Sequence, residues 1–200
     1  MLTLHADSRG RCLAVRGEWI AAVGTLEELL ATHPQARVRQ WPGILTPGLV
    51  NLHGPELLEQ AYHPDPREAD TLGTEPLTGD ALAALPMDEA RWGASARRGV
   101  QRMLANGTVA VAGELRNRAV VAAVRRSGIG VVGRLGVPGG VPALDPFASG
   151  VPVEFSPERE SGSAARFAVF DVRDEDELAE RGGGSCVATV VAGRIVYRRR

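Results

Sequence analysis

The 200-residue chain contains no lysine at all, only two cysteines and few aromatic residues. Its basic side chains are 23 arginines, which nearly balance 24 acidic residues and leave a formal net charge of −1. A net charge this close to zero gives no bulk attraction to nucleic acid or to an acidic membrane surface. The arginines are scattered, apart from the run at residues 198–200, which we interpret as a solvated end. We therefore expect no nucleic-acid partner and no membrane partner.

Cysteine pairs and long hydrophobic runs are also missing. Cys12 and Cys186 lie far apart and belong to no CxxC or His/Cys cluster, which argues against a zinc knuckle and a disulfide framework. The N-terminus has no charged region followed by an apolar one, and no apolar run approaches membrane-spanning length. Two reduced thiols favour the cytoplasm. We expect a soluble cytoplasmic protein with one large or two small domains.

The first 43 residues predict small β structure with one helix. Apolar runs at 12–15 and 19–23 flank a short glycine turn, which is typical of a hairpin. Thr25 and Glu28 form a capping box that opens a short helix. Residues 37–41 then alternate like a half-exposed strand.

The C-terminal residues predict a similar β segment. Residues 167–172 read as a strand, and 174–181 as a short acidic helix that ends at a glycine run. We interpret residues 187–191 and 195–197 as the two strands of a second hairpin, joined by a tight Ala-Gly turn.

The middle of the chain predicts strands that alternate with helices. Buried strands are expected at 44–52, 108–112 and 129–135, with a helix in each interval. The first helix ends at Asn106-Gly107 and the second at Gly128, because glycine tolerates a left-handed conformation. The apolar stripe of the first helix consists of Trp92, Ala96, Val100, Met103 and Leu104. Such alternation implies parallel strands joined by right-handed crossovers.

The segment Ile44–Gly54 carries a resemblance to a known family. Its Pro-Gly pair is followed by an apolar run, His53 and a glycine, and this resembles the "PGLVDxHxH" strand of the amidohydrolase superfamily. That superfamily includes the metal-dependent hydrolases imidazolonepropionase and aminodeoxyfutalosine deaminase. "MLANGTVAVAG" resembles the family's "MLxxGTTTVxD", with Gly113 where an acidic residue often sits. "FAVFDV" and "VATVVAGRIVY" resemble its closing strands.

The resemblance implies an α/β fold in two parts. Residues 1–43 and 166–200 would form one discontinuous composite β-sandwich. Residues 44–135 would form a truncated, open partial (β/α) barrel of about three βα units. Residues 136–165 are rich in Gly, Pro and Ser and would be an irregular linker in place of the later barrel strands. Because an open sheet has edges that are usually covered or paired, we expect a homodimer or a protein partner there.

The resemblance also implies a divalent metal, but this sequence departs from the family's ligand set. The family uses two histidines one residue apart, two further histidines and an aspartate from later strands, and in some branches a carboxylated lysine or a glutamate. Here His53 is present, while Pro55 stands at the second position and has no donor atom. A catalytic zinc takes three protein ligands, so His53 alone cannot hold one. One alternative is an improvised site made of His53, Glu56, His63 and Asp65. The other is that His53 is a hydrogen-bonded residue at a strand tip.

No other chemistry stands out in the sequence. The serines lack a GxSxG elbow, and we interpret Cys186 as a buried small hydrophobe. Residues 128–133 match G-x-G-x-x-G, but they follow a helix and enter a strand, which is the wrong context for a phosphate loop. The acidic stretch 65–80 is expected to be a solvated loop, with a lid over the site as the alternative.

Two functional hypotheses remain. In the first, the chain is a degenerate amidohydrolase-like protein that binds a ligand or partner without catalysis and has no cofactor. In the second, it is a hydrolase or deaminase acting on non-peptide C–N bonds. Its site would be completed by another subunit or by the improvised cluster, with zinc, iron or manganese as the metal.

Overall fold

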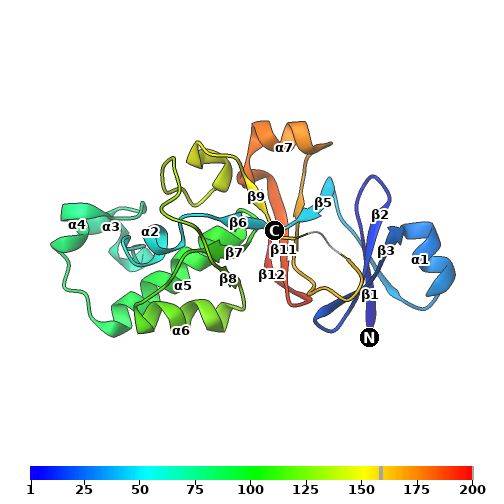
Figure 1. Ribbon diagram of the computed structural model, residues 1–200, viewed down its shortest axis with the longest axis horizontal. Helices are drawn as coiled ribbons and strands as arrows, with labels where there is room; N and C mark the ends of the chain where they lie inside the picture. Colours follow the sequence, from blue (N-terminus) through cyan, green and yellow to red (C-terminus); the bar gives the residue numbers. More distant parts are fainter. Residues whose placement is uncertain (158–159, 200) are drawn as a thin grey trace.

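A computed structural model of the chain describes residues 1–157 and 160–199. Positions 158 and 159 of the expected linker, and Arg200 of the arginine run, lie outside the described residues. Within the described part, the strands form three open four-stranded sheets, and helices accompany them. Figure 1 shows these sheets spread along the longest axis of the molecule, with the sheet that contains β10–β12 in the middle. The fold is therefore mixed α/β.

The first sheet has the order β3-β2-β1-β4. Its strands, given in sequence order, are β1 (Leu2–Ala6), β2 (Arg11–Arg16), β3 (Trp19–Thr25) and β4 (Arg37–Gln40). The predicted hairpin is the antiparallel pair β2–β3. The predicted helix is α1 (Leu26–Thr32), and both hydrogen bonds of the expected capping box between Thr25 and Glu28 are present.

The second sheet joins the C-terminal segment to a strand from the first quarter of the chain. Its order is β12-β11-β10-β5. The strands are β5 (Ile44–Pro47), β10 (Phe167–Phe170), β11 (Cys186–Val191) and β12 (Arg194–Arg198). The predicted turn between β11 and β12 has positive φ at Ala192 (49°) and Gly193 (71°), as a tight hairpin turn requires. The predicted acidic helix is α7 (Glu175–Arg181), which η3 (Gly183–Ser185) follows.

These two sheets share one hydrophobic cluster. Leu13 and Ile20 of the first sheet are buried with Phe167 and Val190 of the second. Asp7 adds a polar link, because its carboxylate accepts from the backbone N–H of Arg9 and Arg11 at 2.9 Å and from that of Leu45 at 3.1 Å. Both ends of the chain therefore contribute to one buried core.

The third sheet has the order β8-β7-β6-β9. Its strands β6 (Leu49–Asn51), β7 (Thr108–Ala112) and β8 (Gly130–Val132) are parallel, and β9 (Glu154–Phe155) is antiparallel to β6. The single strand expected at 44–52 is divided at Gly48 into β5 and β6, which belong to different sheets. A Cβ at Gly48 would lie 2.2 Å from Val109 Cγ1, so only glycine permits this close approach to β7.

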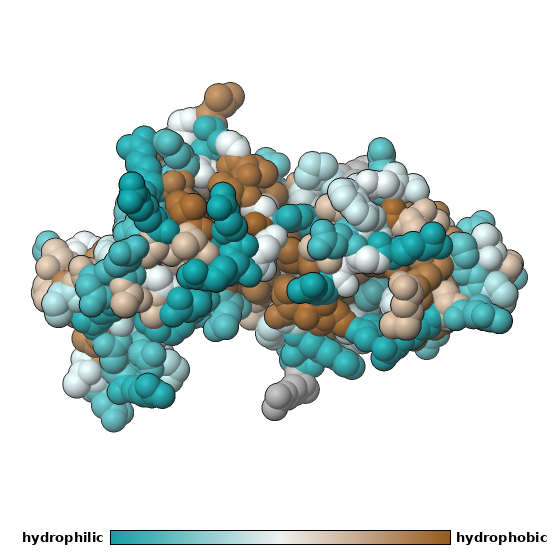
Figure 2. Space-filling model, turned by 90° about the horizontal axis from the view of Figure 1, so that it is seen from below, coloured by the Kyte–Doolittle hydropathy of each residue, from teal (hydrophilic) through white to brown (hydrophobic). Residues whose placement is uncertain are grey.

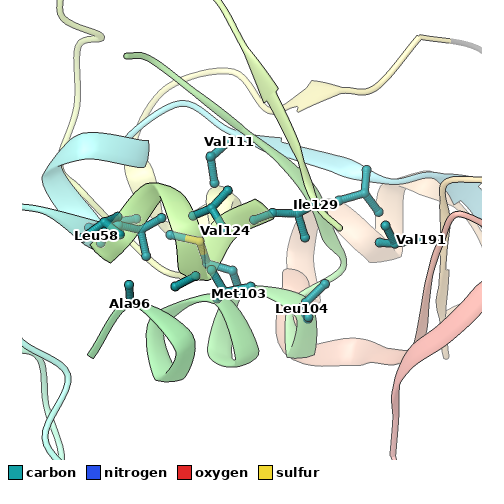
Figure 3. Packing of buried hydrophobic residues seen from close by; sticks show 13 residues of the cluster. Leu58, Ala96, Met103, Leu104, Val111, Val124, Ile129 and Val191 are labelled. Atoms are coloured by element: carbon teal, nitrogen blue, oxygen red, sulfur yellow. The ribbon is translucent and has the colours of Figure 1, made fainter. Parts of the chain in front are cut away.

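Two long helices pack on the third sheet, as predicted. They are α5 (Glu89–Ala105) and α6 (Arg118–Ser127), which ends at Gly128 in the left-handed conformation. Figure 3 shows Met103 of α5 and Val124 of α6 within one cluster with Leu58 of α2, and Val191 of β11 at its edge. This cluster extends the core from the βα units to the second sheet.

Two irregular stretches contain more secondary structure than their composition indicated. After α2 (Gly54–Leu58), the acidic stretch forms η1 (Pro66–Glu68), α3 (Ala69–Leu72) and α4 (Gly79–Ala83). In the linker, η2 (Pro146–Ser149) precedes β9, which pairs with β6. The linker therefore covers one edge of the third sheet and leaves β8 as the other edge.

No helix in residues 1–157 or 160–199 has both the length and the apolar character needed to cross a lipid bilayer.

His5 makes the stability of the paired sheets depend on pH. It is buried, its Nδ1 accepts from Trp41 Nε1 at 3.1 Å, and its ring meets that of Phe167 edge-on with centroids 5.1 Å apart. Burial, with a smaller effect of the Arg39 charge, lowers the pKa of His5 from 6.5 to about 4. Between these two pH values the unfolded chain binds a proton at His5 that the folded chain does not. The free energy of unfolding should therefore decrease by roughly 3 kcal/mol as pH falls through this window.

The variant His5→Asn tests this assignment, because it retains an acceptor near the position of Nδ1 but cannot be protonated. Urea unfolding across the same window should show a shallower pH dependence in the variant than in the wild type. Equal slopes in the two proteins would show that His5 does not cause the effect.

Candidate functional site

The candidate site lies where the three parallel strands end. Carboxyl ends of parallel strands meet at one edge of a sheet, and in barrel enzymes chemistry is placed there. Beyond β6 the chain reaches His53, beyond β7 it reaches Gly113, and beyond β8 it reaches Arg134. The resemblance placed a metal at the first of these positions.

His53 is buried and held by hydrogen bonds at the start of α2. Its backbone N–H donates to Asn51 Oδ1 at 3.0 Å. Its Nε2 lies 3.2 Å from the carbonyl oxygen of Gly139, to which the Nε2–H tautomer donates. The side-chain amide of Asn51 donates to the carbonyl of Ala143 at 2.8 Å. The linker therefore closes over the end of β6 and contacts the imidazole.

Pro55 occupies the space beside the end of β7. A Cβ built on Gly113 would lie 2.7 Å from Pro55 Cδ and 3.1 Å from Arg134 Nε. Gly113 also has a φ of +111°, which L side chains rarely adopt. The position where the family often has an acidic residue thus has no room for a side chain.

Glu56 is bound by Arg134. The two carboxylate oxygens lie 2.7 and 2.9 Å from the two terminal guanidinium nitrogens, and Arg134 Nη1 also donates to the carbonyl of Leu52 at 2.7 Å. The side chains of Arg134 and Glu56 are only 17% and 15% exposed. Burial opposes ionisation of Glu56, but the hydrogen bonds from Arg134 outweigh it and hold the pKa of Glu56 below its ordinary value. Bidentate, charge-assisted contacts of this kind are stronger than neutral hydrogen bonds.

His63 lies elsewhere, between α2 and α5. Its backbone N–H donates to Ser95 Oγ at 2.9 Å, and its Nε2 lies 2.8 Å from the carbonyl oxygen of Leu57. Burial lowers the pKa of His63, so the neutral ring donates from Nε2 to that carbonyl. A Cβ at Gly99 would lie 2.6 Å from His63 Nε2, so glycine on α5 makes room for the ring.

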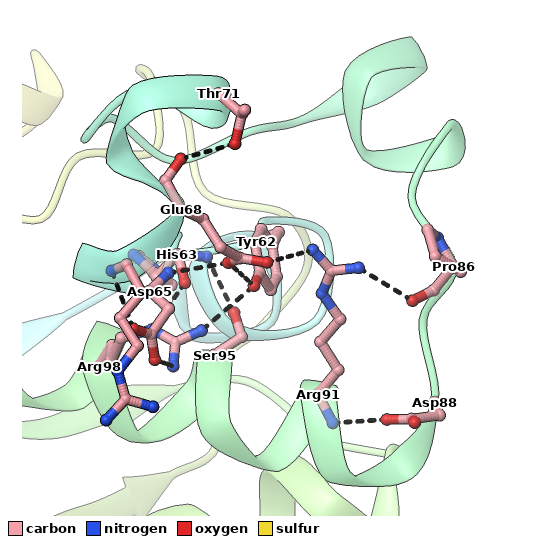
Figure 4. A network of polar contacts seen from close by, with 11 residues as sticks. Tyr62, His63, Asp65, Glu68, Thr71, Pro86, Asp88, Arg91, Ser95 and Arg98 are labelled. Carbon is pink, nitrogen blue, oxygen red and sulfur yellow. Dashed lines mark hydrogen bonds and ion pairs between the residues drawn. The ribbon is translucent and has the colours of Figure 1, made fainter.

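Asp65 belongs to a polar network outside the strand ends (Figure 4). Its carboxylate accepts from the backbone N–H of Arg67 at 3.0 Å and lies 3.3 Å from Arg98 Nη1. The carboxylate of Glu68 accepts a hydrogen bond from the hydroxyl of Tyr62 and forms an ion pair with Arg91 at 2.7 Å. This network attaches the η1–α3 segment to α5, and it satisfies the carboxylates with protein partners.

The structure therefore does not bring the four metal candidates into one ligand set. His53 and Glu56 lie near the strand ends, whereas His63 and Asp65 are engaged beside α5. Over residues 1–157 and 160–199, no three His, Cys, Asp or Glu side chains are grouped so that they could hold a metal ion. Sequence reasoning missed Arg134, which it assigned to a strand. The available signal was that Arg134 is the one charged residue between positions 128 and 144.

An open cleft of about 1110 Å³ lies next to this site. Glu56 and Leu57 of α2 line one wall, and Leu82 of α4 is also part of the lining. Linker residues Leu144 and Asp145 line it as well. The cleft is large enough for a small organic molecule.

The comparison with protein families decides the relationship of the N-terminal part. Residues 12–36 match the family model described as "Imidazolonepropionase-like composite domain, bacteria". This part of the chain is therefore similar to that composite domain. The match confirms the expected resemblance to imidazolonepropionase-like proteins over these residues. None of the curated proteins compared with the chain matches it.

Several solved structures resemble the chain over part of their length. Aspergillus niger ochratoxinase is 18% identical, with a TM-score of 0.45, 66% of this chain covered and 31% of that one. A zinc-bound adenosine deaminase from Xanthomonas campestris is 16% identical, with a TM-score of 0.43 and coverage of 65% and 32%. Helicobacter pylori aminofutalosine deaminase is 12% identical, with a TM-score of 0.41 and coverage of 72% and 36%. The chain thus spans about a third of the length of these proteins.

Replacing Arg134 by methionine tests the importance of the ion pair at the strand ends. Arg134→Met leaves the largely buried carboxylate of Glu56 without its partner. The substitution should therefore lower the free energy of unfolding by about 2 kcal/mol. The matched control is Arg116→Met, because Arg116 and Glu114 form an exposed pair with side chains 81% and 74% exposed. Denaturant unfolding should show little change in the control. Equal losses in both variants would contradict a special role of the Glu56–Arg134 pair.

Proposed function

We propose that this chain is a degenerate amidohydrolase-like protein that binds a partner or a ligand without catalysing hydrolysis. The observation that carries the proposal is the filling of the strand ends by Pro55 and by the Glu56–Arg134 ion pair. In this proposal the third sheet derives from a partial (β/α) barrel of three βα units. The scaffold is kept, while Arg134 occupies the strand ends at which the family holds its metal.

The donor set at the strand ends does not fit a catalytic divalent metal. Pro55 offers no donor atom, and Glu56 already accepts two charge-assisted hydrogen bonds from Arg134. His53 is then the one remaining donor at the end of β6, and its Nε2 faces the carbonyl of Gly139. A catalytic zinc needs three protein ligands, so the family mechanism through a metal-activated water lacks its basis here.

The two cysteines support a non-catalytic protein of the cytoplasm. Cys12 and Cys186 are buried and form no disulfide. Burial raises the pKa of each thiol to about 11, so neither carries a useful thiolate population at neutral pH. This supports the interpretation of Cys186 as a small hydrophobic residue rather than a nucleophile.

The edge of the third sheet at β8 is the proposed partner surface. In the described residues no strand lies beyond β8, and the linker covers the opposite edge. Strand β8 and the residues that follow it carry exposed apolar side chains, namely Val131, Val132, Leu135, Val137 and Val141. On the face seen in Figure 2, hydrophobic surface (brown) likewise forms separate patches between hydrophilic regions (teal).

A second copy of the chain is the partner that this edge fits best. Arg134 is the one charged residue in positions 128–144, and Glu56 neutralises it. Two such segments can therefore approach without like-charge repulsion, and an apolar, nearly uncharged surface is typical of homodimer interfaces. A twofold axis would pair the two β8 strands antiparallel and continue the sheet.

Metal analysis tests the loss of the catalytic centre. Protein purified without a histidine tag should contain no stoichiometric zinc, iron or manganese, and His53→Ala should have the same metal content as the wild type. The measurement is elemental analysis of both proteins after dialysis. Near-stoichiometric metal that disappears in His53→Ala would overturn the proposal and support a hydrolase.

Light scattering tests the partner surface. In size-exclusion chromatography with multi-angle light scattering, the wild type should shift from 21.2 kDa towards twice that mass as its concentration rises through the micromolar range. Val131→Lys places a charge on the open edge and should keep the protein monomeric. The control Val121→Lys changes an exposed valine of α6 and should still dimerise. A wild type that stays monomeric throughout the range would exclude the homodimer.

A further inference from the structure

Arginines from two distant parts of the chain meet around Trp41. The guanidinium carbon of Arg39, on β4, lies 5.7 Å from the centroid of the indole ring. That of Arg198, on β12, lies 5.6 Å from the same centroid. Arg37 is on β4 two residues before Arg39, on the same face of the strand. The edges of the first and second sheets thus form a patch of three arginines, Arg37, Arg39 and Arg198, which we call the arginine patch.

The arginine patch has no carboxylate counterion among the described residues. None of its three side chains takes part in the ion pairs found in residues 1–157 and 160–199. Burial, and then the charges of Arg37 and Arg198, lower the pKa of Arg39, which shows that its neighbours oppose its charge. Arg39 is half-buried, whereas Arg37 and Arg198 are exposed. Like charges held close together raise the free energy of the folded state.

Three half-buried arginines elsewhere in the chain are paired with carboxylates. Arg91 lies 2.7 Å from Glu68, Arg98 3.3 Å from Asp65 and Arg134 2.7 Å from Glu56. A fourth, Arg166, has no ion pair among the described residues and donates to the carbonyl of Val109 at 3.2 Å. The arginine patch differs because it places three charges close together, and no carboxylate among the described residues forms an ion pair with them.

The geometry also indicates which part of each arginine is available. The guanidinium groups of Arg39 and Arg198 lie over the Trp41 ring, and these side chains form no hydrogen bond within the described residues. Their N–H groups remain free to bind an oxyanion in the bidentate manner that suits arginine. Trp41 itself is 6% exposed and donates its N–H to His5, so the indole offers no stacking surface to a ligand. Recognition is limited to an anionic group.

We propose that the arginine patch is a binding site for the phosphate group of a ligand. The site is separate from the ends of β6, β7 and β8, and it does not depend on the function proposed for them. Trp41 orients two guanidinium groups, and the phosphate neutralises the charge that they concentrate. Arg37 adds a third positive charge beside them.

Protection of sheet edges is the competing explanation. Both β4 and β12 are edge strands, and charged side chains on edge strands prevent pairing with other chains. Lysine separates the two explanations, because it keeps the charge but lacks the planar fork that binds phosphate in a bidentate manner. The double variant Arg39→Lys/Arg198→Lys should bind phosphate several-fold more weakly and should keep the wild-type stability and oligomeric state.

Isothermal titration with inorganic phosphate tests the proposal, with sodium chloride of equal ionic strength as the reference. Saturable binding of phosphate to the wild type, absent with chloride and weakened in the double lysine variant, is the expected result. The control Arg125→Lys/Arg126→Lys changes two arginines in the last turn of α6 and should bind like the wild type. Absence of saturable binding, or equal binding by the wild type and the Arg39/Arg198 variant, would overturn the proposal.

A second titration with adenosine 5′-monophosphate distinguishes two sources of the phosphate group. Equal affinities for inorganic phosphate and the nucleotide would support a site for free phosphate. Tighter binding of the nucleotide would support a larger phosphorylated ligand. Loss of nucleotide binding in the double lysine variant is expected in either case, and retention of full affinity would contradict the assignment.

Discussion

The antiparallel pairing of β5 with β10 is the constraint on which the rest of this structure depends. Residues Ile44–Pro47 pair with Phe167–Phe170 along four successive positions, so two segments more than a hundred residues apart in sequence are neighbours in one sheet. The same strands supply Leu45 and Phe167 to the cluster shared with the first sheet. This pairing fixes where the chain enters and leaves its middle region. The βα units and the linker therefore begin and end at the second sheet (Figure 1).

Within the middle region, an ion pair, a proline and the linker meet at the ends of the parallel strands. Arg134 brings a permanent positive charge to the strand ends, and Glu56 neutralises it. Pro55 fills the space beside Gly113. The linker then covers His53 from the other side through Gly139 and Ala143. These contacts satisfy the polar groups at the strand ends with partners from the chain itself, and breaking the ion pair would leave a buried charge unpaired.

Local sequence signals predicted most of the elements but few of their long-range partners. The capping box at Thr25, the apolar stripe of α5 and the glycine at the end of α6 act within a few residues, and each was visible in the sequence. The division of the strand at Gly48 was not, because it depends on contact with Val109 on another strand. The two-residue strand β9 has too short a pattern to detect. Likewise His53 was placed correctly at a strand end, but its linker contacts and the partner of Glu56 required the folded chain.

The adjacency of β5 and β10 has an evolutionary consequence. The first and last residues of the middle region emerge side by side from one sheet, so the distance between them does not depend on how many βα units lie in between. Units can therefore be lost or gained as a cassette without altering the composite domain or its core. Whatever their number, a strand at the edge of the sheet can be paired by a short segment, as Glu154-Phe155 pairs with β6. A scaffold of this kind can carry middle regions of different length on one unchanged base.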